Sequence, residues 1–290
     1  MALIPPDFLN SVTSIEIEKK KEDGKVEKIP IATGFLFGKN TGKKDVENNT
    51  LYSIFLITNR HVFEDRESKN YLKEVYLRFN IGENQGAKYY KALLLDKDNQ
   101  PLWIRHENED VDIAILPVNA QKLKEEGIKF FFFADDLHTF LSSQFKGEGI
   151  STGDGIFVLG FPLGIRGKTR NFVIARQGII ARVDEEVLKE HFFFIDAQIY
   201  PGGSGGPVIL KPELVAIEGT QSHARAGLIG IISEGITYPE VAVSKQTGRP
   251  RIVFEEQTGL IKVVPIDSII DAINTFLKKK GEPESKEKVQ

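Results

Sequence analysis

The stretch IDAQIYPGGSGGPVIL, residues 195–210, is the most informative part of the sequence, because it surrounds one serine with glycines. Four glycines, at positions 202, 203, 205 and 206, flank Ser204, and Pro207 and an apolar run follow them. Each glycine in ordered structure costs about 0.5–1 kcal/mol relative to alanine, so the cluster needs a structural reason. Either the chain makes a tight turn between strands here, or backbone N–H groups beside Ser204 point into a small cavity where a substrate approaches the main chain.

The segments around this stretch have the length and composition of antiparallel β-strands. A first hairpin is predicted over residues 14–38, where isoleucines alternate with glutamates and Asp23-Gly24 supplies a turn. The polar residues 39–49 predict a surface loop, and residues 51–63 predict a buried strand that ends at ITNRHVF. Similar short apolar runs recur through the second half of the chain. The fold class is therefore predicted to be all-β.

The strand pattern divides the chain into two larger parts and a C-terminal helix. Residues 1–135 and 136–264 each hold a set of antiparallel strands, and the crossover between them falls within 119–149. Over residues 265–280, Ile266, Ile269, Ile270 and Ile273 recur at helical spacing, so an α-helix is predicted there. The polar tail, residues 281–290, has too few apolar side chains to fold and is expected to be disordered.

Composition excludes several classes of protein. The chain of 290 residues is 41% hydrophobic and 27% charged, as in globular proteins, and its net charge of −3 gives no basis for binding nucleic acid or an anionic membrane surface. Cysteine is absent, which excludes disulfides and thiolate metal sites, and no histidine–carboxylate cluster has metal spacing. No cofactor is expected. Without a secretory signal at the start or a membrane-length apolar run, the sequence predicts a cytoplasmic location.

A reactive serine requires a base that takes its proton and donors that stabilise the oxyanion. Of the five histidines, His61 alone stands at the end of an apolar strand, where its ring would be held in place. An orienting carboxylate is offered by Asp112 at the head of VDIAIL; Asp110 competes with it, but the apolar run that follows favours Asp112. The N–H groups of Gly202 and Ser204 are the expected oxyanion donors.

Three segments carry a resemblance to a known family. TNRHV around His61, DIAIL from Asp112 and GGSGGPV around Ser204 resemble the signature segments of chymotrypsin/trypsin-like serine proteases, in the same order. FVLGFPLG (157–164), GLIGIIS (227–233) and GLIKVVPIDSII (259–270) are similar to segments of the HtrA/Deg branch. The resemblance spans about residues 30–280, and only ten residues follow the predicted helix, so the PDZ domain usual in HtrA proteases is expected to be missing.

The resemblance implies two six-stranded antiparallel β-barrels, chymotrypsin-like, with the active site in the cleft between them. The first barrel would carry His61 and Asp112, and the second would carry the nucleophile Ser204. The implied activity is that of a serine endopeptidase acting through an acyl-enzyme, with the N–H groups of Gly202 and Ser204 as oxyanion hole. The implied partner is a protein or peptide substrate, with no metal or cofactor.

The same resemblance implies where a substrate would bind. Ser233 and Gly235 would pair with the substrate backbone, and Gln198, six residues before the nucleophile, would lie at the floor of the primary specificity pocket. A glutamine that merely satisfies local backbone is an equally good interpretation. The preference of the pocket stays open, because Lys262 would admit acidic or polar side chains whereas Ile232 favours small aliphatic ones.

Other functions fit the motifs less well. GGSGG also matches the nucleophile elbow of α/β-hydrolases, but that elbow needs a following helix and a later catalytic histidine. Here Pro207 and a strand-like run follow, and the later histidine, His223, stands in a polar loop. GFPLGIRGKT, residues 160–169, lacks the first glycine of a phosphate-binding loop, because Pro162 stands in its place. The alternative from another class is a catalytically quiet binding or scaffold module with the same fold.

One departure from the family pattern concerns activation. Trypsin-like digestive enzymes carry an aspartate before the nucleophile, which pairs with the N-terminus after zymogen cleavage, and this chain has Gly203 there. Cleavage near the N-terminus is therefore not expected to switch the protein on. Because Gly202 and Gly203 also make the loop permissive, the sequence raises the hypothesis that a regulatory protein partner or a peptide orders it. Narrow substrate specificity would restrain the activity equally well.

Overall fold

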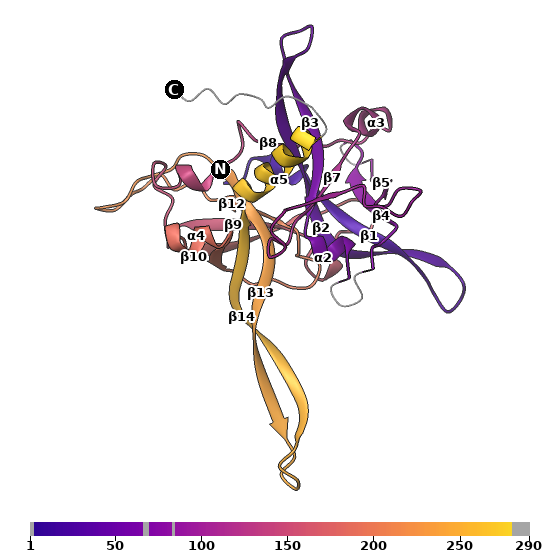
Figure 1. Ribbon diagram of the computed structural model, residues 1–290, viewed down its shortest axis with the longest axis vertical. Coiled ribbons are helices and arrows are strands. Elements are labelled where there is room, and N and C mark those ends of the chain that lie inside the picture. The colour runs from indigo at the N-terminus through magenta and orange to yellow at the C-terminus, as the bar shows by residue number, and fades with distance from the viewer. Residues whose placement is uncertain (1–2, 66–69, 83–84, 280–290) are drawn as a thin grey trace.

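Two β-sheet units lie side by side, and a long hairpin projects from one of them (Figure 1). The computed structural model describes residues 3–65, 70–82 and 85–279. Strands dominate both units, which confirms the predicted fold class. None of the helices in these described ranges combines the length and apolarity that crossing a membrane requires.

The first unit is a sheet with the strand order β5-β4-β1-β2-β3-β7-β6, with β8 parallel to β2. Its strands are β1 (Val12–Lys20), β2 (Val26–Lys44), β3 (Thr50–Thr58), β4 (Glu74–Asn80), β5 (Ala87–Leu93), β6 (Ile104–Arg105), β7 (Ala114–Pro117) and β8 (Phe133–Ala134). Within the described residues it is an open eight-stranded sheet, where the resemblance implied six strands in a closed barrel. Strand β6 has two residues and forms only two residue pairs with β7. It is too short to hydrogen-bond to β5 as well and so close the sheet into a barrel.

The first two strand connections differ in how well their sequences predicted them. The β1–β2 hairpin is confirmed, and Gly24 has the positive φ of 81° that its turn needs. The predicted loop over residues 39–49 was wrong in extent, because β2 continues to Lys44 and only a short turn precedes β3. Asp45 closes that turn by accepting the N–H groups of Glu47 and Asn49. Polar composition there reflects exposure of the strands to water rather than absence of a strand.

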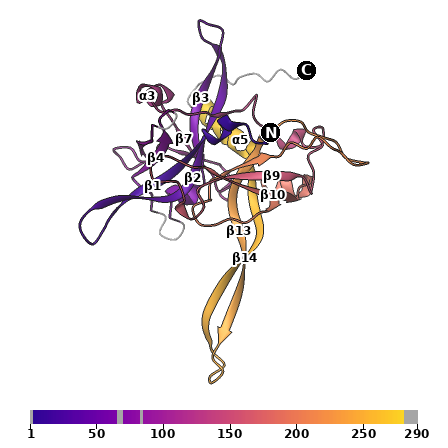
Figure 2. The same ribbon diagram turned by 180° about the vertical axis from the view of Figure 1, so that it is seen from behind.

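The second unit is the closed six-stranded antiparallel barrel that was predicted, with the order β10-β11-β14-β13-β12-β9. Its strands are β9 (Gly155–Gly160), β10 (Ile174–Arg182), β11 (Phe193–Asp196), β12 (Pro207–Leu210), β13 (Gly227–Val243) and β14 (Pro250–Pro265). Phe193, Ile195, Val208 and Val263 are fully buried in its core. Strands β13 and β14 are far longer than the barrel needs, and their outer parts form the projecting hairpin (Figure 2).

The helices are short except for the last one. They are α1 (Pro6–Leu9), α2 (Arg60–Phe63), α3 (Ala120–Glu125), α4 (Glu185–Lys189) and α5 (Ile266–Lys279), with 3₁₀ turns at Ser142–Gln144 and Pro162–Gly164. Helix α5 confirms the predicted periodicity, since Ile266, Ile269 and Ile273 are all buried. The predicted disordered tail, 281–290, lies outside the described residues.

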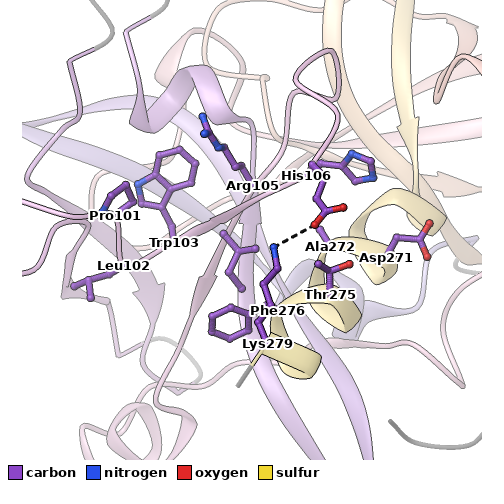
Figure 3. A pocket seen from close by; sticks show the side chains of 12 residues that line it. Pro101, Leu102, Trp103, Arg105, His106, Asp271, Ala272, Thr275, Phe276 and Lys279 are labelled. Atoms are coloured by element: carbon purple, nitrogen blue, oxygen red, sulfur yellow. Dashed lines mark hydrogen bonds and ion pairs between the residues drawn. The ribbon is translucent and has the colours of Figure 1, made fainter. Parts of the chain in front are cut away.

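Helix α5 joins the two units. Its buried residues share one core with residues from both units, including Phe35 of β2 and Ile209 of β12. On its outer side it packs near β6, leaving a pocket of about 360 Å³ between Phe276 and the segment 101–107 (Figure 3). The Lys279 Nζ and Glu107 Oε1 atoms lie 3.2 Å apart at this pocket. The helix thereby sets how the first unit lies against the second.

Candidate active site

His61 lies on the short helix α2, directly after β3, and not at a strand end as predicted. Asn59 directly precedes the helix, and its buried side chain donates from Nδ2 to the carbonyl of Asp112 at 2.9 Å. A buried amide that makes this bond ties the start of α2 to the segment before β7. The fold thus brings residues about fifty positions apart into contact.

Asp112 contacts His61 at two points. Its Oδ2 lies 2.6 Å from His61 Nδ1, and its Oδ1 accepts the backbone N–H of His61 at 3.1 Å. Asp112 is buried, and the His61 side chain is 26% exposed. A carboxylate at Nδ1 makes that nitrogen the donor, so in the neutral ring Nε2 is the acceptor. Asp110, the competing carboxylate, is exposed, and its N–H donates to Asn108 Oδ1.

The other four histidines have different surroundings. His106 and His191 face each other with ring centroids 5.4 Å apart, and burial followed by the charge of His191 lowers the pKa of His106. His138 accepts the N–H of Ala134 through Nδ1, and burial lowers its pKa too. His223 is buried in the loop after β12. His61 is therefore the histidine that the fold pairs with a buried aspartate.

The loop of Ser204 packs against two strands of the first unit, β2 and β3, and β3 leads to His61. The carbonyl of Ser204 accepts the N–H of Thr33 on β2 at 3.0 Å. Gly205 has a φ of 81°, and a Cβ there would lie 2.2 Å from the Thr33 carbonyl oxygen and 2.4 Å from Thr58 Oγ1. Because Thr58 ends β3 just before α2, this close approach explains the glycine after Ser204.

The residues before Ser204 form a hydrogen-bonded turn. The Gly203 N–H donates to the Tyr200 carbonyl at 2.9 Å, and Gly202 has a φ of 91°. Proline at the second position and glycine at the third are the residues that a type II turn requires. The carbonyl of Pro201 accepts the N–H of Leu163 at 2.7 Å. In a trans peptide the C=O and N–H point in opposite directions, so the Gly202 N–H points away from Leu163.

The N–H of Ser204 is oriented in the same way. The carbonyl of Gly203 accepts the Gly206 N–H at 3.1 Å, so the Ser204 N–H in the same peptide points away from Gly206. Among the contacts of the described residues, neither the Gly202 N–H nor the Ser204 N–H donates a hydrogen bond. Both predicted oxyanion donors are thus left for a ligand, in a turn whose carbonyls are engaged elsewhere.

Thr33 connects these pieces, and the sequence analysis did not find it. Its Oγ1 donates to the Gly202 carbonyl at 2.7 Å and accepts the Phe161 N–H at 3.1 Å. Its own carbonyl accepts the Thr58 hydroxyl at 2.9 Å. One residue of the first unit therefore contacts both segments of the second unit that shape the serine loop. Within ATGF, residues 32–35, nothing marks the threonine for this position.

Gln198 is exposed and does not stand alone. Its Oε1 accepts from Arg176 Nη2 at 2.9 Å, and the Arg176 guanidinium lies 5.0 Å from the centre of the Tyr200 ring. A cation therefore accompanies the glutamine beside the serine loop, and the sequence analysis did not identify it.

Ser233 and Gly235 follow the part of β13 that contacts the serine loop. The N–H of Ile232 donates to the Gly206 carbonyl at 3.0 Å, and the pairing of β13 with β12 ends at Ile231. Ser233 and Asp112 both line a cleft of about 590 Å³ between the two units. Lys262 lines it as well, 3.7 Å from Glu234, so positive and negative charge are both present there.

The comparison with known families agrees with this geometry. Residues 32–217 match the trypsin-like peptidase domain. The chain belongs to this family. The matched range contains His61, Asp112 and Ser204 and ends before β13, so Ser233 and Gly235 lie beyond it. Membership of the trypsin-like peptidase family supports a protease-type hydrolase with protein substrates, whereas the narrower likeness to HtrA/Deg proteases stays a prediction.

Proposed function

We propose that the chain is a serine endopeptidase that hydrolyses peptide bonds through Ser204, His61 and Asp112. The Ser204 hydroxyl attacks the substrate carbonyl while His61 Nε2 takes its proton, and His61 then delivers that proton to the leaving amine. Water releases the acyl group from Ser204 by the reverse proton transfers. Asp112 holds the imidazole in one tautomer and stabilises the imidazolium that forms.

The observation that carries this proposal is the double contact between Asp112 and His61. A carboxylate that binds Nδ1 at 2.6 Å and the backbone N–H at 3.1 Å fixes both the rotation and the position of the ring. An aspartate with only a structural role would not need to bind both the ring nitrogen Nδ1 and the backbone N–H of the same histidine. The arrangement supports a base whose Nε2 is the proton acceptor.

The N–H groups of Gly202 and Ser204 are the proposed oxyanion donors. The bonds to Pro201, Gly202 and Gly203 carbonyls orient this turn without a ligand, which supports a preformed hole. Preformed donors need no reorganisation during reaction, and loss of one such donor typically costs about 10²–10³ in rate.

The substrate backbone is proposed to pair with Ser233 and Gly235 on β13. Beside Gln198, the Arg176 guanidinium supports cleavage after acidic or polar side chains rather than basic ones, because a second positive charge beside it is disfavoured. A peptide-library cleavage profile tests this preference, and Arg176→Gln should broaden it. A profile dominated by lysine or arginine before the cut would exclude it.

A restricted set of protein substrates in an intracellular setting completes the proposal. Two forms of restraint are compatible with it: narrow specificity and a regulatory partner. The hydrogen bonds that already order the turn favour narrow specificity. Equal hydrolysis rates with and without added binding partners would agree with that choice, and strong activation by a partner would reverse it.

Covalent labelling by a fluorophosphonate tests the activity directly. The wild-type chain should be labelled, and Ser204→Ala and His61→Ala should not, because the reagent needs an activated hydroxyl. Ser151→Ala changes an exposed serine away from the site and should label like the wild type. A wild-type chain that stays unlabelled while folded would favour the binding or scaffold module instead.

A further inference from the structure

The loop between β9 and β10, residues 161–173, contacts the turn that precedes Ser204. The Leu163 N–H donates to the Pro201 carbonyl at 2.7 Å. That carbonyl and the Gly202 N–H, one of the two proposed oxyanion donors, belong to the same peptide. Type I and type II turns differ by a half-turn of this peptide, so the bond from Leu163 selects one orientation of the donor. The position of Leu163 therefore decides where the Gly202 N–H points.

Leu163 has a backbone conformation that leucine rarely adopts. Its φ of 55° and ψ of 22° lie in the left-handed region, which is unfavourable for a residue with a branched side chain. The side chain is 63% exposed, so apolar burial does not offset this cost. Strained backbone of this kind persists where surrounding contacts hold it in place. The conformation of Leu163 therefore depends on the contacts that anchor its loop.

An ion pair anchors the loop close to Leu163 in the chain. Arg166 Nε lies 2.6 Å from Oε1 of Glu16 on β1, and Arg166 Nη2 donates to Oε2 at 3.3 Å. Glu16 is fully buried, and its carboxylate also accepts the hydroxyl of Tyr89 on β5 at 3.1 Å and that of Ser14 at 3.2 Å. Both carboxylate oxygens are therefore occupied, and the pair joins the second unit to the first.

The Arg166 side chain also contacts the strand beside Leu163. Its Nη2 donates to the Lys28 carbonyl on β2 at 3.3 Å. The turn Pro162–Gly164 lies against the same strand, since a Cβ at Gly164 would come within 3.0 Å of Pro30 Cγ. The guanidinium therefore holds the turn that contains Leu163 against β2.

A second arginine anchors the far end of the loop. Arg78 on β4 is buried, and it donates to Asn171 Oδ1 at 2.6 Å and to the carbonyls of Lys168 and Arg166 at 3.1 and 3.3 Å. These bonds hold the backbone that follows Leu163 to β4. Of the two arginines, Arg166 is therefore the one whose side chain reaches β1 and β2, next to the strained turn.

Stability alone does not explain why Glu16 and Arg166 are charged. The cost of removing an ion pair from water often cancels its attraction, so well-packed apolar residues are often as stable. A guanidinium that binds a carboxylate at two points adds a defined direction. We infer that Glu16 and Arg166 are positioning residues: their ion pair holds Leu163 in its strained conformation and so keeps the Gly202 N–H directed at the substrate. This inference rests on the proposed hydrolysis by Ser204.

Fluorophosphonate labelling tests the effect of the ion pair on the serine. Glu16→Gln and Arg166→Gln each break the pair, and each should slow labelling about tenfold or more, because the oxyanion donor is then in place for less of the time. The double variant should be no slower than the slower single variant, since both residues act through one interaction and no buried charge stays unpaired. Wild-type rates in both single variants, or losses that multiply in the double variant, would overturn the inference.

Lys39→Gln is the matched control, because it breaks another buried ion pair. Lys39 Nζ lies 2.8 Å from Asp135 Oδ2, and both side chains are largely buried. Neither residue belongs to the β9–β10 loop or to the serine loop. Lys39→Gln should therefore lower the temperature of unfolding but label like the wild type. Equal slowing in Lys39→Gln and Arg166→Gln would overturn the inference, because any loss of stability would then slow labelling.

Amide hydrogen exchange, followed by NMR, tests the positioning independently of hydrolysis. In Arg166→Gln the Leu163 N–H should exchange about tenfold or more faster than in the wild type, because its bond to Pro201 opens more often. Lys39→Gln should leave that rate unchanged. Wild-type exchange at Leu163 in Arg166→Gln would overturn the inference. A wild-type chain that is not labelled would instead refute the proposed function, and the exchange rates would still decide whether the ion pair holds Leu163.

Discussion

Thr33 shows how much of this site depends on one hydroxyl group. Thr33→Val keeps the shape of the side chain but leaves the Gly202 carbonyl and the Phe161 N–H without their partner. Because the Tyr200–Gly203 turn, which carries a proposed oxyanion donor, then loses one of its hydrogen bonds, we expect fluorophosphonate labelling to slow about 10- to 100-fold. Thr33→Ser retains the hydroxyl and should label at nearly the wild-type rate. Equal labelling rates for the valine variant and the wild type would show that the hydroxyl does not position the turn.

Asp112 and Asp110 provide a matched pair at the same scale. Asp112→Asn removes the charge that stabilises the imidazolium and favours the wrong ring tautomer, so hydrolysis should fall about 10⁴-fold. Asp110→Asn changes an exposed carboxylate two positions away and should have little effect. Turnover of a peptide substrate, with thermal unfolding as the check of folding, measures both. Similar losses in the two variants would contradict the assignment of Asp112.

Single residues differ in how far the sequence reveals them. Ser204, His61 and Asp112 stand in short segments whose own composition is unusual, so the sequence alone suggests them as candidates, and the contact of His61 with Asp112 agrees with that suggestion. Thr33 and its partner Gly202 are separated by 169 positions, and the bond exists only because two units pack together. The contact of Arg176 with Gln198 likewise joins different strands and loops. Such roles depend on tertiary distances that no local pattern contains.

At the scale of an element, the turn Tyr200–Gly203 depends on the backbone of Gly202. A Cβ at Gly202 would lie 2.6 Å from the Phe161 carbonyl oxygen, and its φ of 91° is unfavourable for other residues. Gly202→Ala should therefore disrupt the turn and abolish labelling. Gly219→Ala is the control, because Gly219 has a φ of 85° but no atom within 4 Å of its Cβ position. Labelling that survives in Gly202→Ala would show that the turn tolerates a side chain.

Elements were predicted best where burial repeats at a regular period. Helix α5 follows its pattern closely, because one face of it is buried and the other is not. The β1–β2 hairpin was predicted from its turn at Asp23-Gly24, although both faces of β1 are buried from Val12 to Glu16. The end of β2 over residues 39–44 was missed because its side chains are polar and pass from buried at Lys39 to exposed at residues 42–44, so no apolar alternation marks the strand. Helix α2 was missed because its four residues are too few for any period to appear.

At the scale of the molecule, the cleft depends on the core that both units and α5 share. Ile273 is fully buried in that core, whereas Ile270, on the same helix, is only partly buried against it. Ile273→Ala should lower the free energy of unfolding by about 2–5 kcal/mol, because it removes buried contacts and leaves a cavity. Ile270→Ala should cost less.

Because this core lies between the two units, chemical unfolding of Ile273→Ala also tests whether the units unfold together. If the shared core couples the two units, chemical unfolding should remain one cooperative transition that shifts as a whole, and labelling of Ser204 should be lost along the same curve. The proposed site takes His61 from the first unit and Ser204 from the second, so its activity is expected to be lost when the units separate. A first transition that melts one unit while labelling persists would show that α5 does not hold the two halves of the site together.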